Sequence, residues 1–466
     1  METKQFRRYG HQFVDWVADY MENVENYPVM SRVKPGEIRA KLPACPPQAP
    51  ESMDSIFRDF KEIIVPGITH WQHPGWHAYF PANNSPASIL AELLTAGIGA
   101  QCMVWQTSPA AAELEDVVLE WLRQMLGLPE GFVGVIQDTA STATLCALLC
   151  AREWATDFAS NEKGLSLPLV VYASQETHSS VEKGVKIAGY GKENLRLIPS
   201  DDEFAMIPEK LEEAILRDKE KGLRPACVVA TIGTTSSTAV DPLAAIGRIC
   251  RRQNVWLHVD AAYAGTAAIL PEKQWVLEGK EDMDSFVFNP HKWMLTNFDC
   301  SAYFVKDAGR LVRTFEIHPE YLKTGVDPLV KNYRDWGIQL GRRFRALKLW
   351  WVIKSYGVEG LQDILRQHCA WAQAFAGWVS SDSRFELLAP VPLALVCFRL
   401  RPRDGEALAA VNERNRELLA RINATRQVYL SHTALDGRYT IRMAIGARAT
   451  ELRHVEEAWA LIGAST

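Results

Sequence analysis

The sequence predicts an α/β protein built around a mostly parallel central sheet. Short runs rich in β-branched residues recur from about residue 133, and helical segments lie between most of them. These runs are residues 133–136, 169–172, 227–232, 255–259, 285–288 and 302–305. Asp260 and Lys292 each follow one of the runs closely, and ligands of such sheets bind at the carboxyl ends of strands.

The regions that flank this sheet in the sequence have a different pattern of apolar residues. Apolar residues spaced by three, four or seven predict an amphipathic helix over the first two dozen positions, and a proline-rich connector follows it. Such a helix must pack on something else, and a neighbouring subunit can serve. We expect a helical arm over 1–85 that packs on a partner subunit, a large cofactor-binding domain over 86–345, and a small C-terminal α+β domain over 346–466.

Within the large domain, Ser108-Pro109 predicts the start of a helix. Its expected apolar face consists of Leu114, Val117, Trp121, Leu122, Met125 and Leu126. In the C-terminal domain, residues 393–399 and 440–444 are candidate strands among further helices.

Composition excludes several classes of protein. The chain has 466 residues, of which 23% are charged and 47% hydrophobic, as in an ordinary globular enzyme. A net charge of −5 gives no electrostatic footprint for nucleic acid or an anionic membrane, and no apolar stretch is long enough to span a bilayer. The nine cysteines are scattered without a Cys-x-x-Cys pair, which favours reduced thiols and a cytoplasmic location.

Asp260 and Lys292 together suggest a specific chemistry. A lysine amine can hold an aldehyde as an imine, and a carboxylate can keep a ring nitrogen protonated. Pyridoxal phosphate (PLP) requires both groups, and a spacing of 32 residues lets two strands deliver them to one edge of a sheet. Taken singly, the lysine could belong to any surface loop and the aspartate could be an ordinary helix cap. Their order, each after an apolar run, favours PLP.

Three other segments could complete such a site. Residues 137–142 lie between a strand and a helix, so their backbone N–H groups could bind a phosphate, although a plain N-cap explains them as well. Thr235 and His178 also follow strands and could add a hydroxyl and a stacking ring. The proline-containing segment 317–328 is long enough for a lid, with Tyr321 as its chemical group, or is a solvated loop.

His70, His73 and His77 invite a metal hypothesis. Pro74-Gly75 interrupts any helix that would align them, and no carboxylate or cysteine stands at ligand spacing, so we predict no metal. The aromatic residues nearby belong either to a core or to the wall of an aromatic-substrate pocket.

Taken together, these residues resemble the aromatic-L-amino-acid decarboxylases, the group II PLP-dependent decarboxylases. The resemblance covers nearly the whole chain. The motifs that carry it include residues 69–71, 78–81, 134–137, 178–180, 259–265, 288–293, 297–301, 319–323 and 341–345. It implies the aspartate-aminotransferase fold (fold type I), with a mostly parallel central sheet, an N-terminal helical arm, and a homodimer whose active site lies at the subunit interface.

The resemblance also implies roles for individual residues. Lys292 would hold PLP as an imine, Asp260 would bind the pyridinium nitrogen, and His178 would stack over the ring and orient the substrate carboxylate. Tyr321, contributed by the partner subunit, would guide protonation of Cα. Further cofactor contacts are implied for Ala140, Ser141, Thr235, Ala262, Asn289 and His291.

The substrate pocket implied by the family comprises Trp71, Tyr79, Phe80, Pro81, Ala82, Met103 and Gly341. Ala82 replaces a threonine common in animal members, which removes a hydrogen bond to a catechol worth about 1 kcal/mol. Gly341 resembles plant members that use indole substrates, whereas serine there is typical of phenol users. Asp138-Thr139 replaces a Gly-Ser pair, which favours a bacterial-type member.

We therefore expect an enzyme that decarboxylates Trp, Phe, Tyr, DOPA or 5-hydroxytryptophan to the arylalkylamine and CO2. The nearest alternative is an aromatic aldehyde synthase on the same scaffold, although related synthases have Phe where this chain has Tyr321. A transaminase is less expected because no arginine set for a second carboxylate is evident. A noncatalytic PLP-binding subunit is disfavoured by the complete set of catalytic residues, and a glutamate decarboxylase by the aromatic wall.

Overall fold

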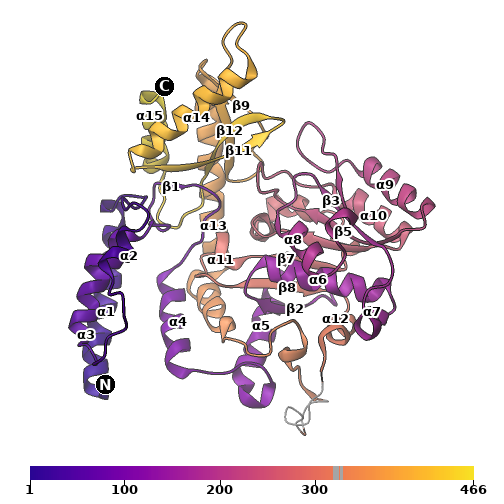
Figure 1. Ribbon diagram of the computed structural model, residues 1–466, viewed down its shortest axis with the longest axis horizontal. Coiled ribbons are helices and arrows are strands. Elements are labelled where there is room, and N and C mark those ends of the chain that lie inside the picture. The colour runs from indigo at the N-terminus through magenta and orange to yellow at the C-terminus, as the bar shows by residue number, and fades with distance from the viewer. Residues whose placement is uncertain (318–324, 326–328) are drawn as a thin grey trace. The chain divides into compact units, whose positions relative to one another are not determined.

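The computed structural model describes residues 1–317, 325 and 329–466, and Tyr321 lies outside them. Its contacts divide the chain into two compact units (Figure 1). Unit 1 comprises Met1–Pro81 and Arg399–Thr466, and unit 2 comprises Ala82–Phe398. The division of the chain at residues 85 and 345 stays a prediction. No helix in the described ranges is long and apolar enough to cross a membrane.

Unit 2 contains the sheet that the sequence predicts. Seven strands follow the order β2-β8-β7-β6-β5-β3-β4, and all run parallel except β8. The strands are β2 (Val133–Gln137), β3 (Leu169–Ser174), β4 (Leu195–Ile198), β5 (Arg224–Thr231), β6 (Trp256–Asp260), β7 (Ser285–Phe288) and β8 (Ser301–Val305). The six predicted runs are confirmed as strands, and β4 was missed.

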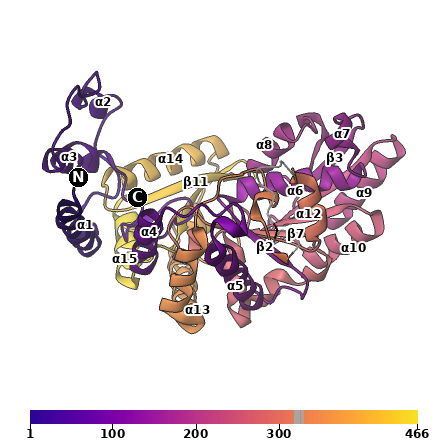
Figure 2. The same ribbon diagram turned by 90° about the horizontal axis from the view of Figure 1, so that it is seen from below.

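Helices cover both faces of this sheet (Figure 2). On one face α6, α8 and α12 pack against Val135, Val171, Val229 and Val287 in a continuous apolar core, while α9 and α10 contact β5 from outside that core. The helices of unit 2 are α4 (Pro86–Ile98), α5 (Pro109–Met125), α6 (Ala140–Ala155), α7 (Ala159–Lys163), α8 (Ser180–Ile187), α9 (Pro208–Glu220), α10 (Leu243–Gln253), α11 (Pro290–Trp293), α12 (Ala308–Phe315) and α13 (Arg345–Ser381). Strands β9 (Phe385–Leu387) and β10 (Leu395–Leu400) follow α13.

Unit 1 is built from an N-terminal and a C-terminal segment of the chain. Strand β1 (Trp76–His77) pairs in parallel with β11 (Tyr429–Leu435), which pairs antiparallel with β12 (Arg438–Ala444). Its helices are α1 (Thr3–Asn23), α2 (Glu37–Lys41), α3 (Met53–Asp59), α14 (Leu408–Ala424) and α15 (Leu452–Ala464). The first helix is confirmed. Phe13 of α1 packs on Phe57 of α3 with ring centroids 4.7 Å apart, whereas Phe6 stays exposed.

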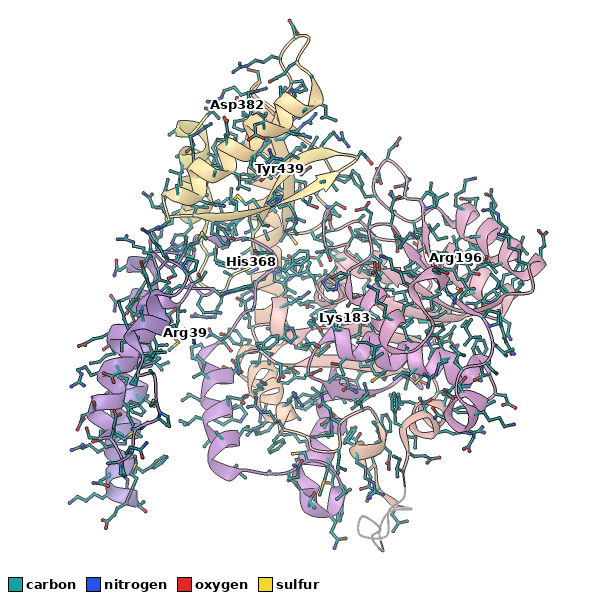
Figure 3. The ribbon with its side chains drawn as sticks, in the orientation of Figure 1. Arg39, Lys183, Arg196, His368, Asp382 and Tyr439 are labelled. Carbon is teal, nitrogen blue, oxygen red and sulfur yellow. The ribbon has the colours of Figure 1, made fainter. Side chains whose placement is uncertain are left out.

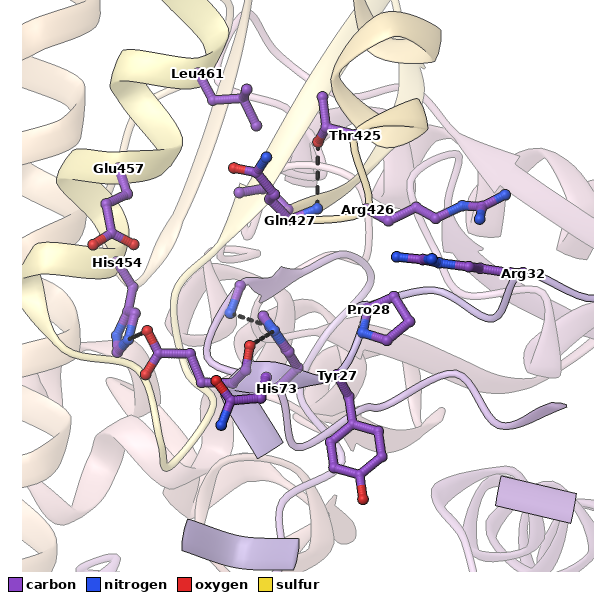
Figure 4. Close-up of a pocket in the computed structure, with 14 residues that line it drawn as sticks. Tyr27, Pro28, Arg32, His73, Thr425, Arg426, Gln427, His454, Glu457 and Leu461 are labelled. Atoms are coloured by element: carbon purple, nitrogen blue, oxygen red, sulfur yellow. Dashed lines mark hydrogen bonds and ion pairs between the residues drawn. The ribbon is translucent and has the colours of Figure 1, made fainter. Parts of the chain in front are cut away.

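A cavity of about 420 Å³ lies within unit 1 (Figure 4). Glu25 at its wall accepts hydrogen bonds of 2.7 Å from both terminal nitrogens of Arg453. These bonds lower the pKa of the Glu25 carboxyl to about 2. None of the site residues predicted from the sequence lines this cavity, so it does not define the candidate active site.

Helix α5 corrects one expectation from the sequence. It begins at Pro109 as predicted, but Val117 of the expected apolar face is 43% exposed, and the buried face includes Glu115. Glu115 is 2% exposed, and its Oε1 accepts hydrogen bonds from Arg342 Nη2 at 2.6 Å and from Ile136 N–H at 2.8 Å. The buried face of α5 is therefore displaced by one residue from the expected face, and it includes the buried ion pair between Glu115 and Arg342.

We predict that Glu115→Ala destabilises the protein by about 3–5 kcal/mol, because it leaves the buried Arg342 guanidinium without its counter-ion and the Ile136 N–H without its acceptor. Glu413→Ala, which removes an exposed ion pair with Arg416 on α14, should cost less than about 1 kcal/mol. Urea unfolding and thermal midpoints of both variants measure the difference. Equal losses would contradict the assignment of Glu115 as a buried anchor.

Candidate active site

Lys292 lies just beyond the carboxyl end of β7. The strand ends at Phe288, Asn289 caps the four-residue helix α11, and Lys292 is half-buried within that helix. Burial lowers the pKa of its ammonium group, and the carboxylate of Asp260 opposes this effect. The amine of Lys292 is therefore close enough to Asp260 for the two charges to interact.

Asp260 is the last residue of β6, beside β7 in the sheet, and its register partner on β7 is Val287. The side chain is 4% exposed, and Oδ1 accepts a hydrogen bond from Ala262 N–H at 3.1 Å. This bond orients the carboxylate, whose Oδ2 could meet a cationic ring nitrogen. The sheet thus brings Asp260 and Lys292 to the same edge, as their spacing predicted.

His178 follows β3 and lies at the same edge of the sheet as Asp260 and Lys292. Its Nδ1 lies 2.8 Å from the hydroxyl oxygen of Ser180, which fixes the plane of the ring. Partial removal of the ring from water lowers the pKa of His178, Asp260 raises it, and Lys292 lowers it further. His178 is exposed, so a flat cofactor could stack on its ring.

The segment expected to bind phosphate begins a helix at the same edge of the sheet. Thr139 caps α6 by accepting a hydrogen bond from Thr142 N–H at 3.4 Å. The N–H groups of Ala140 and Ser141 lie in the first turn, where a helix has no partner of its own for them. Asp138 accepts a hydrogen bond of 2.6 Å from Thr139 N–H, which tightens the loop before the helix.

Three further cofactor candidates differ in their surroundings. Asn289 is buried, and its Oδ1 accepts a 2.7 Å hydrogen bond from the Ser301 hydroxyl, which directs the amide nitrogen elsewhere. Thr235 is exposed after β5, and Ala262 is half-buried after β6. Both therefore lie beyond the carboxyl ends of neighbouring parallel strands.

The ring of His291 is fixed by contacts with other residues of the chain. Its Nδ1 accepts a hydrogen bond from Cys300 N–H at 2.9 Å, and its ring lies 4.7 Å from that of Phe298. Burial lowers the pKa of His291 to about 3, so the ring is neutral at physiological pH. A cofactor contact of His291 stays a prediction.

The residues expected to line the substrate pocket are divided between the units. Trp71, Tyr79, Phe80 and Pro81 belong to unit 1, where the rings of Trp71 and Tyr79 stack at 5.9 Å. Their contribution to the site stays a prediction. His70, His73 and His77 of this unit each bond to a different partner, and among the described residues no group of His, Cys, Asp and Glu could hold a metal ion.

Ala82, Met103 and Gly341 belong to unit 2. The segments around Met103 and Gly341 lie side by side, because Cys102 N–H donates to the Arg342 carbonyl at 3.0 Å. A Cβ added at Gly341 would meet only the Gln101 side chain, at 3.4 Å. A serine would therefore fit in the chain as described, and the effect of Gly341 on the substrate stays a prediction.

The structure adds residues that sequence reasoning missed. Trp293 stacks on Tyr263 with centroids 4.8 Å apart, and its Nε1 donates to His368 Nδ1 on α13 at 2.9 Å (Figure 3). Asn83 Nδ2 donates to the Lys292 carbonyl at 2.8 Å. No local pattern marks these partners, because they lie 75 and 209 residues away in the sequence.

These groups fit PLP. The amine of Lys292 could take the aldehyde, the buried carboxylate of Asp260 could take the ring nitrogen, and the free N–H groups at the start of α6 could take the phosphate. All three lie at one edge of one sheet. PLP would supply an electron sink at this edge.

Comparisons with known proteins agree with this chemistry. The chain is 47% identical to phenylacetaldehyde synthase of Arabidopsis thaliana, with 99% of this chain and 96% of the relative covered. It is 45% identical to tryptophan decarboxylase 2 of Oryza sativa subsp. japonica, with 99% and 94% covered. A crystal structure of Oryza sativa TDC with PLP and tryptamine has a TM-score of 0.97 at 40% identity, with 100% of this chain and 98% of that chain covered.

These relatives are plant enzymes, so the expectation of a bacterial-type member finds no support. The structural similarity confirms fold type I. A model of the pyridoxal-dependent decarboxylase conserved domain matches residues 35–401, and the chain belongs to this family of PLP-dependent enzymes.

Proposed function

We propose that this enzyme decarboxylates aromatic L-amino acids to the corresponding arylalkylamines. The observation that carries the proposal is that Lys292, Asp260 and His178 lie at or just after the carboxyl ends of β7, β6 and β3 in one sheet. The aromatic class of substrate is supported by similarity to a tryptophan decarboxylase and to a crystal structure with bound tryptamine. Trp, Phe, Tyr, DOPA and 5-hydroxytryptophan are all candidates.

Each residue would have a distinct task. When bound, PLP supplies a sink for the electron pair that remains when the bond between Cα and the carboxylate breaks and CO2 leaves. Lys292 would hold the cofactor, and Asp260 would keep a proton on the ring nitrogen. His178 would orient the substrate carboxylate, and Tyr321 would deliver a proton to Cα to complete the amine.

An aldehyde synthase is the second candidate, because a relative at 47% identity is a phenylacetaldehyde synthase. That reaction also releases CO2, but it consumes O2 and water and yields an aldehyde, ammonia and hydrogen peroxide. Tyr321 favours the amine because a phenol can donate a proton to Cα and a phenyl ring cannot.

We further propose a homodimer, and helix α4 supports it. Its polar residues Ser88 and Thr95 are buried, whereas its apolar residues Leu90, Leu93, Leu94 and Ile98 are 45–64% exposed. This inverted arrangement leaves a row of large apolar side chains for another subunit to cover. The nine cysteines form no disulfide, which supports the proposed cytoplasmic location.

Lys292→Ala should abolish the visible absorbance of bound PLP and lower CO2 release by more than about a thousandfold, because covalent attachment is lost. Borohydride reduction followed by peptide mapping should find PLP on Lys292 in the wild type and on no lysine in the variant. Lys306→Ala, an exposed lysine of unit 2, should behave like the wild type. Reducible PLP on another lysine of Lys292→Ala would disprove the assignment.

Tyr321→Phe should shift the products from amine towards aldehyde, because the proton donor for Cα is lost. We expect amine formation to fall by about 10²–10⁴-fold, the usual contribution of a general acid. Amine, aldehyde, ammonia and peroxide are measured together with CO2 under air. If the wild type already releases aldehyde and peroxide in proportion to CO2, the synthase is the correct function.

In a competition among the five candidate amino acids, we expect indole substrates to be favoured by up to about tenfold in amine formed. Gly341→Ser should reduce this preference, because the added hydroxymethyl group takes up space that an indole needs. The Gln101 side chain at 3.4 Å leaves room for the variant to fold. A preference for phenols in the wild type, or no change in the variant, would contradict the role of Gly341.

A further inference from the structure

The short turn that carries Lys292 is held by the residues that start helix α4. Asn83 is 1% exposed, and its Nδ2 donates to the carbonyl oxygen of Lys292 at 2.8 Å. Five residues further on, Ser88 Oγ accepts a hydrogen bond from Asn297 N–H at 3.3 Å. Lys292 is therefore bonded to the residue three positions before α4 begins, and Asn297 is bonded to the first turn of α4.

The hydrogen bond from Asn83 gives the backbone carbonyl of Lys292 a donor that the short helix α11 cannot supply. Helix α11 contains only four residues, so its carbonyl groups have no N–H partner one turn ahead within the helix. A buried carbonyl oxygen that accepts no hydrogen bond lowers the stability of the folded protein. The amide of Asn83 supplies a donor at Lys292, the position from which the reactive amine extends.

The start of α4 is itself well fixed. Ser85 and Ser88 form a reciprocal capping box, with Ser85 N–H donating to Ser88 Oγ at 3.0 Å and Ser88 N–H donating to Ser85 Oγ at 3.3 Å. One turn later, Glu92 pairs with Lys348 Nζ of α13 at 3.0 Å and with Arg343. Asn83 therefore precedes a helix that is anchored on two sides, which suits a positioning role.

We propose that Asn83 is a positioning residue for Lys292, and that its side-chain amide holds the backbone of Lys292 where the amine meets Asp260 and His178. The inference rests on the proposed role of Lys292 as the residue that binds PLP. Without the amide, the hydrogen bond between Asn83 and the Lys292 carbonyl is lost, while that between Asn297 and Ser88 remains. The amine would then sample positions away from Asp260.

The test compares Asn83→Ala with Asn415→Ala in the full-length enzyme. Asn415 is a fully buried asparagine of unit 1 whose side chain also bonds to backbone groups, so the chemical change is the same. We expect Asn83→Ala to weaken PLP binding about tenfold in a titration followed by visible absorbance, and to shift the pH dependence of that absorbance. Asn415→Ala should lower the thermal midpoint and leave both spectroscopic properties unchanged.

Two outcomes would overturn the inference: unchanged PLP affinity and pH profile in folded Asn83→Ala, or equal changes in Asn415→Ala. Should Asn83→Ala fail to fold, Asn83→Asp retains the shape and replaces the donor by an oxygen that repels the Lys292 carbonyl. It is expected to weaken PLP binding at least as much, and wild-type affinity in Asn83→Asp would equally overturn the inference. Peptide mapping of the reduced wild type separates the two proposals, since PLP absent from Lys292 would refute the proposed function itself.

Discussion

The arrangement of the site depends on one electrostatic contact, between the amine of Lys292 and the carboxylate of Asp260. Asp260 ends β6, and Lys292 follows the neighbouring parallel strand β7 in the short helix α11, so the sheet brings the two groups to the same edge. Burial alone would favour a neutral amine, and Asp260 opposes that effect. A PLP bound at this edge would be held by the amine of Lys292 on one side and by the carboxylate of Asp260 at its ring nitrogen on the other.

Charged groups also organise the surrounding scaffold. Arg342 follows the segment proposed as the lid, and Glu115 ties it to β2 and α5 through a buried ion pair. The backbone carbonyl of Arg342 accepts a hydrogen bond from the N–H of Cys102, which precedes Met103. Residues proposed to face the substrate are thus fixed to the sheet by charge-assisted hydrogen bonds, which impose a defined geometry that apolar contacts would not.

Helix α4 connects the proposed subunit contact with the proposed catalytic lysine. Its exposed side carries leucines, and its buried side carries serine and threonine together with the Glu92 carboxylate that pairs with α13. The segment that carries Lys292 is hydrogen-bonded to Asn83, just before this helix, and to Ser88 in its first turn. A partner that covers the leucines would therefore also steady the turn, which gives a physical reason for an active site to form at a subunit interface.

The sequence by itself determined six of the seven strands of the large sheet, their mostly parallel orientation, and the positions of Asp260, His178 and Lys292 at or after strand ends. These features depend on local apolar periodicity and on the rule that parallel strands end at one edge. Strand β4 was missed because it has only four residues, includes the charged Arg196, and leaves Leu197 exposed. Only the tertiary structure decided that α5 buries Glu115, that α4 turns its leucines outward, and that Asn83 reaches Lys292 across 209 residues. Each of these outcomes requires a partner distant in sequence, and a local pattern contains no information about such a partner.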